Sequence, residues 1–357
     1  MLWLGMAGYN VAMTRIQALG VLLAFLTIVC ANARDSQQDT WSGVERIVAV
    51  GDVHGDYDAL VTVLRSANLL DEKNNWSGGK THLAQTGDVL DRGPDSRKAM
   101  DLLMRLEGQA EQAGGHVHAL IGNHEAMNVY GDLRYVSAGE YAAFADPGSK
   151  PSGDHPAGYN EHRVAFSPKG TYGKWILSHN AAVKINDTLF MHGGISPKYV
   201  STKISQINDR VRDDLKHPDN AQGGILTDPE GPLWYRGLAI EDESNLQSHL
   251  NKVMKNFGIE RIVVSHTYAN AAITPRFAGR VVMIDIGLSR VYDGISKVGC
   301  LVIEGPHAYV LHRGTKLELP KDSPKDLLQY LKTCAALDPP PSPLAKRIAE
   351  LESKVGN

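Results

Sequence analysis

The stretch Gly87–Gly93 (GDVLDRG) decides how this chain is organised. Residues Lys80–Thr86 before it are predicted to form a short strand. Residues Pro94–Gly108 after it are predicted to form a helix, because proline suits a first turn and apolar residues recur at helical spacing. Two aspartates and an arginine therefore lie on a tight turn at the carboxyl end of a strand, where open α/β sheets bind their ligands. Taken alone, the turn also fits a surface salt bridge on a loop.

The same succession of strand, polar turn and helix occurs twice more. The β-branched run Arg46–Val50 ends in Gly51–Asp56 (GDVHGD), and the run His116–Ile121 ends in Gly122–Glu125 (GNHE). The glycine before each polar group lets the backbone turn sharply, so that the next side chain points out of the sheet. Three strand ends thus offer Asp with His, Asp with Asp, and Asn with His, which are ligands for divalent metals.

Two more histidines follow later strands. The hairpin signal Asn186-Asp187 precedes the strand Thr188–Met191, which runs into His192. The strand Arg261–Val264 runs into Ser265 and His266. Helices are predicted at 208–216 and 246–254, and further β runs at 280–284, 299–303 and 308–312. Strands that alternate with helices in this way predict an α/β protein.

Composition places the chain among ordinary soluble globular proteins. It has 357 residues, of which 43% are hydrophobic and 22% charged, enough for a sizeable core. The length allows two domains or one large α/β domain. The net charge of −3 provides no basic field, so nucleic acid is not expected as a main partner.

Residues 1–33 resemble a secretory signal peptide. They contain one basic residue, Arg15, and no Asp or Glu, and the apolar run Ile16–Val29 precedes the cleavage pattern Ala31-x-Ala33. Met13 competes with Met1 as the start. The alternative is an uncleaved membrane anchor, but the apolar run of about 14 residues is shorter than the roughly 20 that span a bilayer. We therefore expect export to a periplasm or outside the cell, with no membrane span after removal of the signal.

Behind the signal peptide we expect three parts. They are a flexible lead-in at 34–45, a catalytic domain at 46–320 and a C-terminal extension at 321–357 with a short amphipathic helix. The segment Gly131–Tyr172 is weakly periodic and is predicted to be a long functional loop, in which Glu161–Arg163 are candidates for substrate contact.

Several residues are predicted to have no catalytic role. His116, His118 and His179 are interpreted as structural. An exported compartment permits a disulfide between Cys300 and Cys334, but a buried free thiol in a strand is equally compatible with the sequence.

Six nitrogen and oxygen donors at the ends of separate strands form the candidate metal site. They are Asp52, His54, Asp88, Asn123, His192 and His266. Six such donors exceed the needs of one structural zinc and fit two ions about 3.5–4 Å apart that share a bridging carboxylate, for which Asp88 is central. Singly, each residue also fits a cap or a loop hydrogen bond. Such a pair of ions converts bound water to hydroxide, which attacks a phosphate ester in line.

Four further residues complete the candidate site. Arg92 and Arg236 can neutralise phosphate oxygens, because guanidinium matches phosphate with two hydrogen bonds. Arg236 also fits a surface charge beside an aromatic residue. His124 is placed to protonate the leaving group, and Asp91 can hold its imidazole oriented and charged.

These ordered blocks resemble the signature of the calcineurin-like metallophosphoesterases. They are Gly51-Asp52-x-His54-Gly55, Gly87-Asp88-x-x-Asp91-Arg92-Gly93, Gly122-Asn123-His124-Glu125, His192-Gly193-Gly194 and the late His266. The second block is similar to that of the phosphoprotein phosphatase branch. Leu233–Gly237 (LWYRG) and Asp285–Ser289 (DIGLS) resemble the bacterial Shewanella-like protein phosphatases.

The resemblance implies a four-layer αββα sandwich with a dinuclear metal site at the edge of the sheets. It also implies the ligand, acid and arginine roles given above, with two divalent ions (Mn, Fe or Zn). The eukaryotic branch carries Ser-Ala-Pro-Asn-Tyr where Asp285–Ser289 stands here, so inhibitor binding and regulatory-subunit docking do not carry over. A preference between phosphotyrosine and phosphoserine does not carry over either.

Three functions are compatible with the sequence. The first is a metal-dependent phosphatase of serine, threonine or tyrosine side chains in phosphoproteins. The second is an enzyme of the same fold that acts on nucleotides or other small phosphates. An exported location favours this function, because few phosphoproteins are expected outside a cell. Asp91 argues against a dinucleotide substrate, because the dinucleotide-cleaving enzymes of this fold tend to lack that aspartate. The third is an inactive phosphate-binding scaffold, against which the intact ligand set argues.

Overall fold

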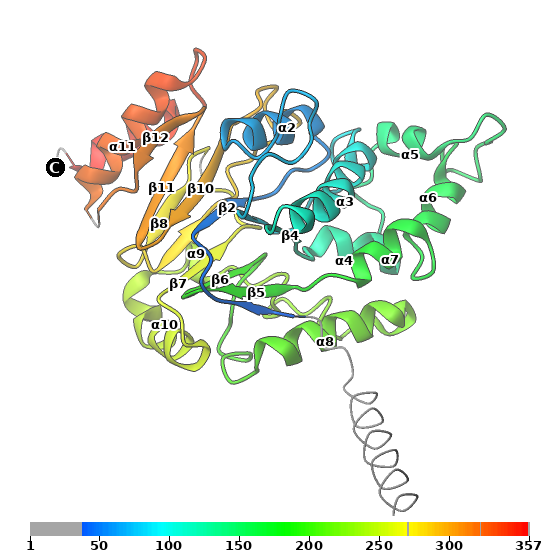
Figure 1. The fold of residues 1–357 in the computed structure, drawn as a ribbon, viewed down its shortest axis with the longest axis horizontal. Coiled ribbons are helices and arrows are strands. Elements are labelled where there is room, and N and C mark those ends of the chain that lie inside the picture. The colour runs from blue at the N-terminus through cyan, green and yellow to red at the C-terminus, as the bar shows by residue number, and fades with distance from the viewer. Residues whose placement is uncertain (1–37, 270, 322, 356–357) are drawn as a thin grey trace, which may run out of the picture. The chain divides into compact units, whose positions relative to one another are not determined.

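The computed structural model describes residues 38–269, 271–321 and 323–355. The predicted signal peptide lies outside these residues, so export stays a prediction from the sequence. Within the described part, no helix is long and apolar enough to cross a bilayer. Two six-stranded mixed sheets with helices on their outer faces make up this part of the chain, which confirms the predicted α/β sandwich (Figure 1).

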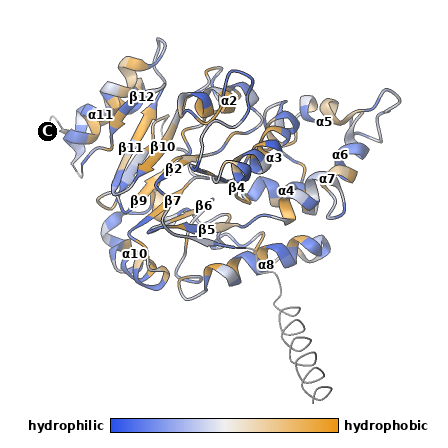
Figure 2. Cartoon of the chain, viewed as in Figure 1, coloured by the Kyte–Doolittle hydropathy of each residue, from blue (hydrophilic) through white to orange (hydrophobic). Residues whose placement is uncertain are grey.

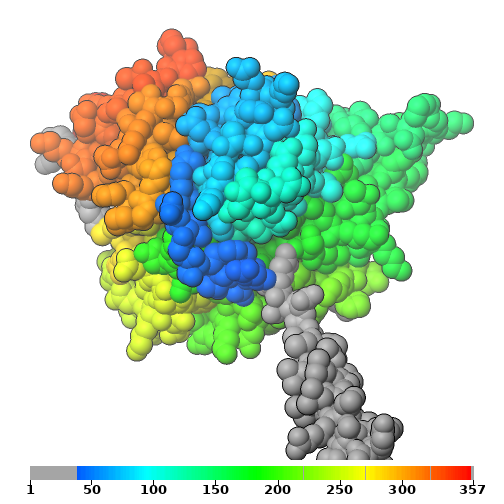
Figure 3. All heavy atoms as spheres, in the orientation of Figure 1, coloured from blue at the N-terminus to red at the C-terminus, as the bar shows by residue number. Residues whose placement is uncertain are grey.

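The first sheet brings residues from both ends of the described chain together. Its order is β12-β11-β10-β2-β3-β4, with β2, β3 and β4 parallel and the other three antiparallel. Val302 of β10 pairs with Val48 of β2, and Figure 3 shows the orange C-terminal residues beside the blue and cyan ones. The strands are β2 (Arg46–Val50), β3 (His82–Gln85), β4 (His116–Ala119), β10 (Gly299–Glu304), β11 (His307–His312) and β12 (Thr315–Glu318).

The second sheet has the order β1-β5-β6-β7-β9-β8. The predicted hairpin joins β5 to β6, while β6, β7 and β9 are parallel neighbours. The strands are β1 (Thr40–Trp41), β5 (Ala182–Ile185), β6 (Thr188–Met191), β7 (Arg261–Val264), β8 (Thr274–Arg276) and β9 (Val281–Met283).

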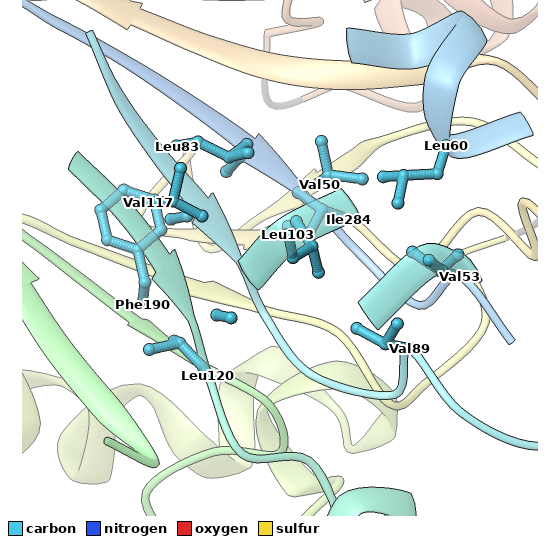
Figure 4. Packing of buried hydrophobic residues seen from close by; sticks show 14 of the residues in the cluster. Val50, Val53, Leu60, Leu83, Val89, Leu103, Val117, Leu120, Phe190 and Ile284 are labelled. Atoms are coloured by element: carbon cyan, nitrogen blue, oxygen red, sulfur yellow. The ribbon is translucent and has the colours of Figure 1, made fainter. Parts of the chain in front are cut away.

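The core between the sheets follows from the alternation of side chains along each strand. In β6, Leu189 and Met191 belong to the cluster under α10, whereas Phe190 lies in the inter-sheet cluster with Val117 of β4 (Figure 4). In β7, Val263 joins the same inter-sheet cluster. Burial of both faces explains why these strands are continuous apolar runs, which stand out in Figure 2.

Helices cover the outer faces of both sheets. Apolar residues of α2 and α3, among them Leu60 and Leu103, pack on the first sheet, as their helical spacing predicts. Leu250 and Val253 of α10 pack on the second sheet, and α8 contacts β5. These helices are α2 (Tyr57–Ser66), α3 (Ser96–Gln112), α4 (Asn123–Tyr130), α8 (Ile204–Lys216), η2 (Pro218–Asn220), α9 (Gly237–Ile240) and α10 (Glu243–Phe257).

The prediction of a loop over Gly131–Tyr172 is wrong. The segment contains α5 (Ala138–Phe144) and α6 (Tyr159–Phe166), and α7 (Thr171–Leu177) begins at its end. Helices of about two turns are too short to show a clear apolar period, and tertiary contacts stabilise them instead. The expected substrate contacts at Glu161–Arg163 are instead contacts within the protein: Arg163, for example, donates to the carbonyl oxygen of Asn128 at the end of α4.

The C-terminal residues form two helices, α11 (Pro324–Leu337) and α12 (Ala345–Val355). The sequence pattern predicted the second and missed the first. Both contribute buried side chains, such as Leu331 and Leu351, to a small third cluster. Cys334 of α11 and Cys300 of β10 are both buried free thiols, which decides between the alternatives left open above.

Candidate metal centre and active site

The carboxyl ends of the parallel strands from both sheets meet at one edge. In the first sheet, the Thr86 N–H after β3 donates to the carbonyl of Val50 in β2 at 3.0 Å. In the second, the Ser265 N–H donates to the carbonyl of His192 at 2.9 Å. The hydroxyl of Thr86 donates to that of Ser265 at 2.8 Å and so links the two sheets at this edge. The predicted ligands follow these strands directly.

The loops at this edge are held in conformations that side-chain-bearing residues rarely adopt. His54, Asp88, Asp91, Arg92 and His266 all have left-handed backbones, with φ of 44°, 56°, 70°, 64° and 63°. Such residues cost about 1–3 kcal/mol each and persist only where the surrounding structure imposes them. Their concentration at the strand ends indicates that this edge is a functional site.

Asp88 lies at the centre of the ligand cluster. Its Oδ2 is 3.3 Å from His192 Nε2, 3.7 Å from His54 Nε2 and 3.7 Å from His124 Nε2. All of these side chains are buried. Potential ligand atoms thus surround one carboxylate oxygen, as expected of a carboxylate that bridges two ions.

Backbone carbonyls orient two of the imidazoles toward this centre. His54 Nδ1 lies 2.8 Å from the carbonyl oxygen of Leu90, and His192 Nδ1 lies 2.9 Å from that of Thr86. Since a carbonyl can only accept, each Nδ1 carries the proton and each Nε2 presents a lone pair to the cluster. This second contact is the usual arrangement behind metal-ligating histidines.

The remaining candidate ligands lie close to the same centre. Asp52 Oδ2 is 3.8 Å from His54 Nε2, and Asn123 Oδ1 is 2.8 Å from His192 Nε2. His266 Nε2 is buried and has no hydrogen-bond partner among the described residues. A buried nitrogen without a partner is costly, so its position fits a metal ligand. The fold therefore brings together all six side chains that the sequence predicted as ligands.

The charges of this cluster also fit divalent cations. Burial, together with the negative charges of Asp285 and Asp88, raises the pKa of Asp52 well above its usual value. Burial alone would raise the pKa of Asp88 too, but the neighbouring His192 and His124 hold it well below. Burial and the nearby His192 lower the pKa of His266 to about 2, so its imidazole is neutral and able to ligate. A divalent cation would stabilise the ionised forms of these buried carboxyl groups, and imidazoles are suitable ligands beside them.

His124 and Asp91 form a buried pair next to the cluster. His124 Nδ1 lies 2.5 Å from Asp91 Oδ2, and the Asn128 amide donates to the other Asp91 oxygen at 3.0 Å. Burial opposes the charged imidazole, but the negative charges of Asp88 and Asp91 outweigh it and raise the pKa of His124. A protonated His124 whose Nε2 lies near the cluster can donate a proton there.

The two predicted phosphate-binding arginines lie at the rim of the cluster. The exposed Arg92 guanidinium contacts the rings of Tyr135 and Tyr292, whose centroids are 4.8 Å and 5.6 Å from its Cζ. The exposed Arg236 donates to the carbonyl oxygen of His266 at 2.6 Å. A cavity of about 500 Å³ opens beside Arg236, lined also by Tyr130, Asp132, Arg134 and Trp234.

Two residues of this edge were not predicted as site residues. Asp285, after β9, is buried; beyond the effect of burial, its charge raises the pKa of Asp52, and the charge of Asp88 raises the pKa of Asp285 in turn. It also follows a strand end, so the pattern that identified the other ligands could have found it. The buried Glu125 carboxylate accepts backbone N–H bonds from Gly122, Asp88 and Val89 at 2.7–2.8 Å. Its position three residues after Gly122 is that of a capping box.

Gly122 must be a glycine because the Asp88 loop crosses it closely. A Cβ at this position would collide with Asp88 Oδ1 and lie 2.8 Å from Glu125 Oε2. We expect Gly122→Ala to lower the free energy of unfolding by about 2–3 kcal/mol, because neither backbone nor carboxylate can yield without moving the cluster.

Denaturant unfolding of Gly122→Ala measures this, with Gly108→Ala as the control. Gly108 lies within α3, and a Cβ there meets nothing within 4 Å. We expect that substitution to raise the free energy of unfolding by about 0.5–1 kcal/mol, because alanine favours the helix. Equal effects of the two substitutions would contradict the steric argument.

Comparisons with known proteins agree with this geometry. The calcineurin-like phosphoesterase family matches residues 45–270. Shewanella-like protein phosphatase 2 of Arabidopsis thaliana is 30% identical over 298 residues, which cover 71% of this chain and 74% of that protein. An uncharacterised protein of Schizosaccharomyces pombe is 36% identical over 262 residues, which cover 70% and 74%. The crystal structure of a cold-active protein-tyrosine phosphatase from a psychrophilic Shewanella species is similar with a TM-score of 0.68 and 32% identity, covering 79% of this chain and 82% of that one.

Proposed function

The chain belongs to the calcineurin-like phosphoesterase family, and from this premise we propose that it removes phosphate from serine, threonine or tyrosine side chains of proteins. That it is a hydrolase of phosphoesters follows from the family itself. The observation that carries the finer proposal is the buried His124–Asp91 pair beside Asp88. The alkoxide or phenoxide that leaves from such a side chain needs a proton, and this pair is placed to supply it.

The six predicted ligands are proposed to hold two divalent ions. Asp52 and His54 would hold one ion, Asn123, His192 and His266 would hold the other, and Asp88 would contribute to both. Bound there, two ions polarise the phosphoryl group and lower the pKa of a water molecule, so that hydrolysis needs no nucleophilic side chain. Mixed nitrogen and oxygen donors suit manganese, iron or zinc.

We propose that the two arginines bind the phosphate group of the substrate. We propose that the cavity beside Arg236 binds the part of the substrate next to that phosphate. Arg236 uses Nη1 to hold the backbone of His266, so its guanidinium is fixed at the rim. Contacts with the rings of Tyr135 and Tyr292 restrict the guanidinium of Arg92 as well. A fixed guanidinium loses little entropy on binding, which favours recognition of a phosphate dianion. The cavity beside Arg236, which Tyr130 and Trp234 line together with charged and polar side chains, suits the side chains of a peptide.

Chelation and substrate choice test this proposal together. We expect EDTA to abolish hydrolysis of p-nitrophenyl phosphate, by roughly 1000-fold or more, and Mn²⁺ to restore it, because the proposed mechanism has no metal-free route. We expect kcat/KM on a phosphotyrosine or phosphoserine peptide to exceed that on a dinucleoside polyphosphate by at least about tenfold.

The same assays separate the alternatives. A higher kcat/KM on nucleotides or other small phosphates would replace the protein substrate by a small one and leave the metal chemistry intact. No turnover of any substrate by protein that retains its metal would favour a phosphate-binding scaffold and contradict the proposal.

A further inference from the structure

A buried glutamate outside the proposed metal and phosphate sites holds the loop that carries Asp91. Glu140 of α5 has no exposed surface, and its Oε2 accepts hydrogen bonds from the Asp91 backbone N–H at 3.1 Å and the Ser96 hydroxyl at 2.8 Å. The Asp91 backbone is left-handed, with φ 70°, and such a conformation needs support from outside the loop. Glu140 supplies part of that support.

Two more contacts connect the same two segments. The Arg92 N–H donates to the carbonyl oxygen of Tyr135 at 2.9 Å, and the Ser137 hydroxyl donates to that of Gly93 at 3.0 Å. Residues 135–140 therefore lie alongside the loop at 91–96 and contact it at several points. Figure 1 shows α5 and α6 next to α3 and α4, and the helix contacts agree.

His162 of α6 is the polar neighbour of the other Glu140 oxygen. Its Nε2 lies 3.6 Å from Glu140 Oε1, and both side chains are completely buried. The imidazole packs among the rings of Tyr141, Phe144 and Phe166. Within the described residues, neither Glu140 Oε1 nor either nitrogen of His162 has a hydrogen-bond partner. Polar atoms kept in such apolar surroundings cost stability, which points to a role beyond packing.

We propose that Glu140 is a positioning residue: through the Asp91 backbone it directs the Asp91 carboxylate toward His124, while His162 covers its second oxygen. The inference rests on the proposed role of His124 as the acid. Asp91 is the link, because its backbone N–H donates to Glu140 Oε2 and its side-chain Oδ2 contacts His124 Nδ1. A small displacement of Asp91 would misdirect the His124 proton, and misplacement of catalytic groups by about 1 Å can cost roughly 100-fold in rate.

The charge state of Glu140 indicates which substitution should preserve this role. Burial and the nearby Asp91 carboxylate raise the pKa of Glu140 well above its usual value. A neutral Glu140 can accept from Asp91 with Oε2 and carry its proton on Oε1, the oxygen that lies 3.6 Å from His162 Nε2. A glutamine amide offers the same acceptor and donor, so we expect Glu140→Gln to keep kcat within about threefold of the wild type.

Glu140→Ala tests the role through the leaving group. Phenyl phosphate releases a phenolate whose conjugate acid has a pKa of about 10, as for tyrosine, whereas p-nitrophenolate is a much better leaving group. We expect Glu140→Ala to lower kcat by about 10- to 100-fold on phenyl phosphate, but by about threefold or less on p-nitrophenyl phosphate. The metal content should not change, because Glu140 makes no contact with the proposed ligands in the described structure.

Glu161→Ala is the matched control. Glu161 is next to His162 on α6, the helix that packs against α5, and it accepts a hydrogen bond from Ser149 Oγ, so its loss removes a neighbour of the Glu140–His162 pair without touching Asp91. We expect equal kcat values for this variant and the wild type on both substrates. If Glu140→Ala does not fold, Ser96→Ala is the variant to measure, because it removes one hydrogen bond to Glu140 Oε2. We expect kcat of this variant to show the same dependence on the leaving group, with a loss of about threefold to tenfold on phenyl phosphate.

A double variant distinguishes positioning from general damage. In a His124→Ala background, Glu140→Ala should change kcat on phenyl phosphate by less than about twofold, because it acts through His124. A full multiplicative loss, or an equal loss on both substrates in the single variant, would overturn the inference. The single variant His124→Ala separates the proposed acid role of His124 from the proposed positioning role of Glu140. If the loss of kcat depends on the leaving group in His124→Ala but not in Glu140→Ala, only the role of Glu140 is contradicted. If neither variant shows that dependence, the acid role itself fails.

Discussion

Asp88→Asn is expected to lose bound metal and activity together. Asp88 Oδ2 has three imidazole Nε2 atoms within 3.7 Å, and it is the only carboxylate oxygen in the described structure proposed to serve both ions. The amide removes one negative charge from the centre of the cluster and places an N–H₂ group where one carboxylate oxygen was. Neither change suits a bridging ligand, so both ions should bind more weakly.

The expected loss in kcat/KM is roughly 1000-fold or more, which corresponds to about 4 kcal/mol of transition-state stabilisation. Elemental analysis of the purified variant measures metal content, and p-nitrophenyl phosphate hydrolysis with added Mn²⁺ measures activity. A variant that retains two ions per chain and near wild-type activity would contradict the proposed centre.

Asp95→Asn is the matched control for this change. Asp95 lies in the same connection between β3 and α3, but its carboxylate pairs with the exposed Lys98 at 2.7 Å. The Asp95→Asn substitution removes one negative charge, as Asp88→Asn does, seven positions further along the chain. We expect metal content and kcat to stay at wild-type values, because an exposed ion pair contributes at most about 1 kcal/mol and lies outside the ligand cluster.

His124→Ala is expected to keep the metal and lose rate in a way that depends on the leaving group. His124 presents Nε2 to the cluster at 3.7 Å from Asp88 Oδ2, while Asp91 holds its Nδ1. General acid catalysis contributes about 10²- to 10⁴-fold, so kcat on phenyl phosphate should fall by about that factor. The loss on p-nitrophenyl phosphate should be about tenfold or less, because that leaving group needs little proton transfer.

Kinetics on both substrates at saturating Mn²⁺ measure this difference. Asp91→Asn should reproduce the pattern with a smaller loss, because the amide keeps a contact with His124 Nδ1 but not the charge that favours imidazolium. Equal losses on the two substrates would remove His124 from the acid role, and loss of metal would assign it to the ligands.

The ligand set could be predicted because it depends on local patterns. Asp52, Asp88 and His192 each follow an apolar run, and the carboxyl ends of parallel strands lie at the same edge of a sheet. Knowledge of the strand ends is therefore enough to expect that these side chains meet. The helices α2 and α3 were predictable for a similar reason, since their apolar residues recur at helical spacing over ten or more positions.

The surroundings of the site could not be predicted in this way. The segment with α5 and α6 has helices of 7 and 8 residues, too short for a reliable period, and its principal contacts reach residues far along the chain. Glu140 is 49 positions from Asp91, whose backbone it holds. No local pattern connects the two, so the predicted loop was wrong and the support for Asp91 was missed.

Local sequence patterns are thus enough to predict which residue types act as ligands and that they lie at strand ends, because side-chain alternation and parallel pairing depend on only a few residues. Packing of the whole chain is needed to aim those ligands. The carbonyl that orients His54 is 36 positions away and the one that orients His192 is 106 positions away. The first contact forms only after β2 has paired with β3, and the second only after the two sheets have packed on each other, because loop closure must precede both. The tertiary structure therefore decides which nitrogen of each imidazole faces Asp88 and how the His124–Asp91 pair is held.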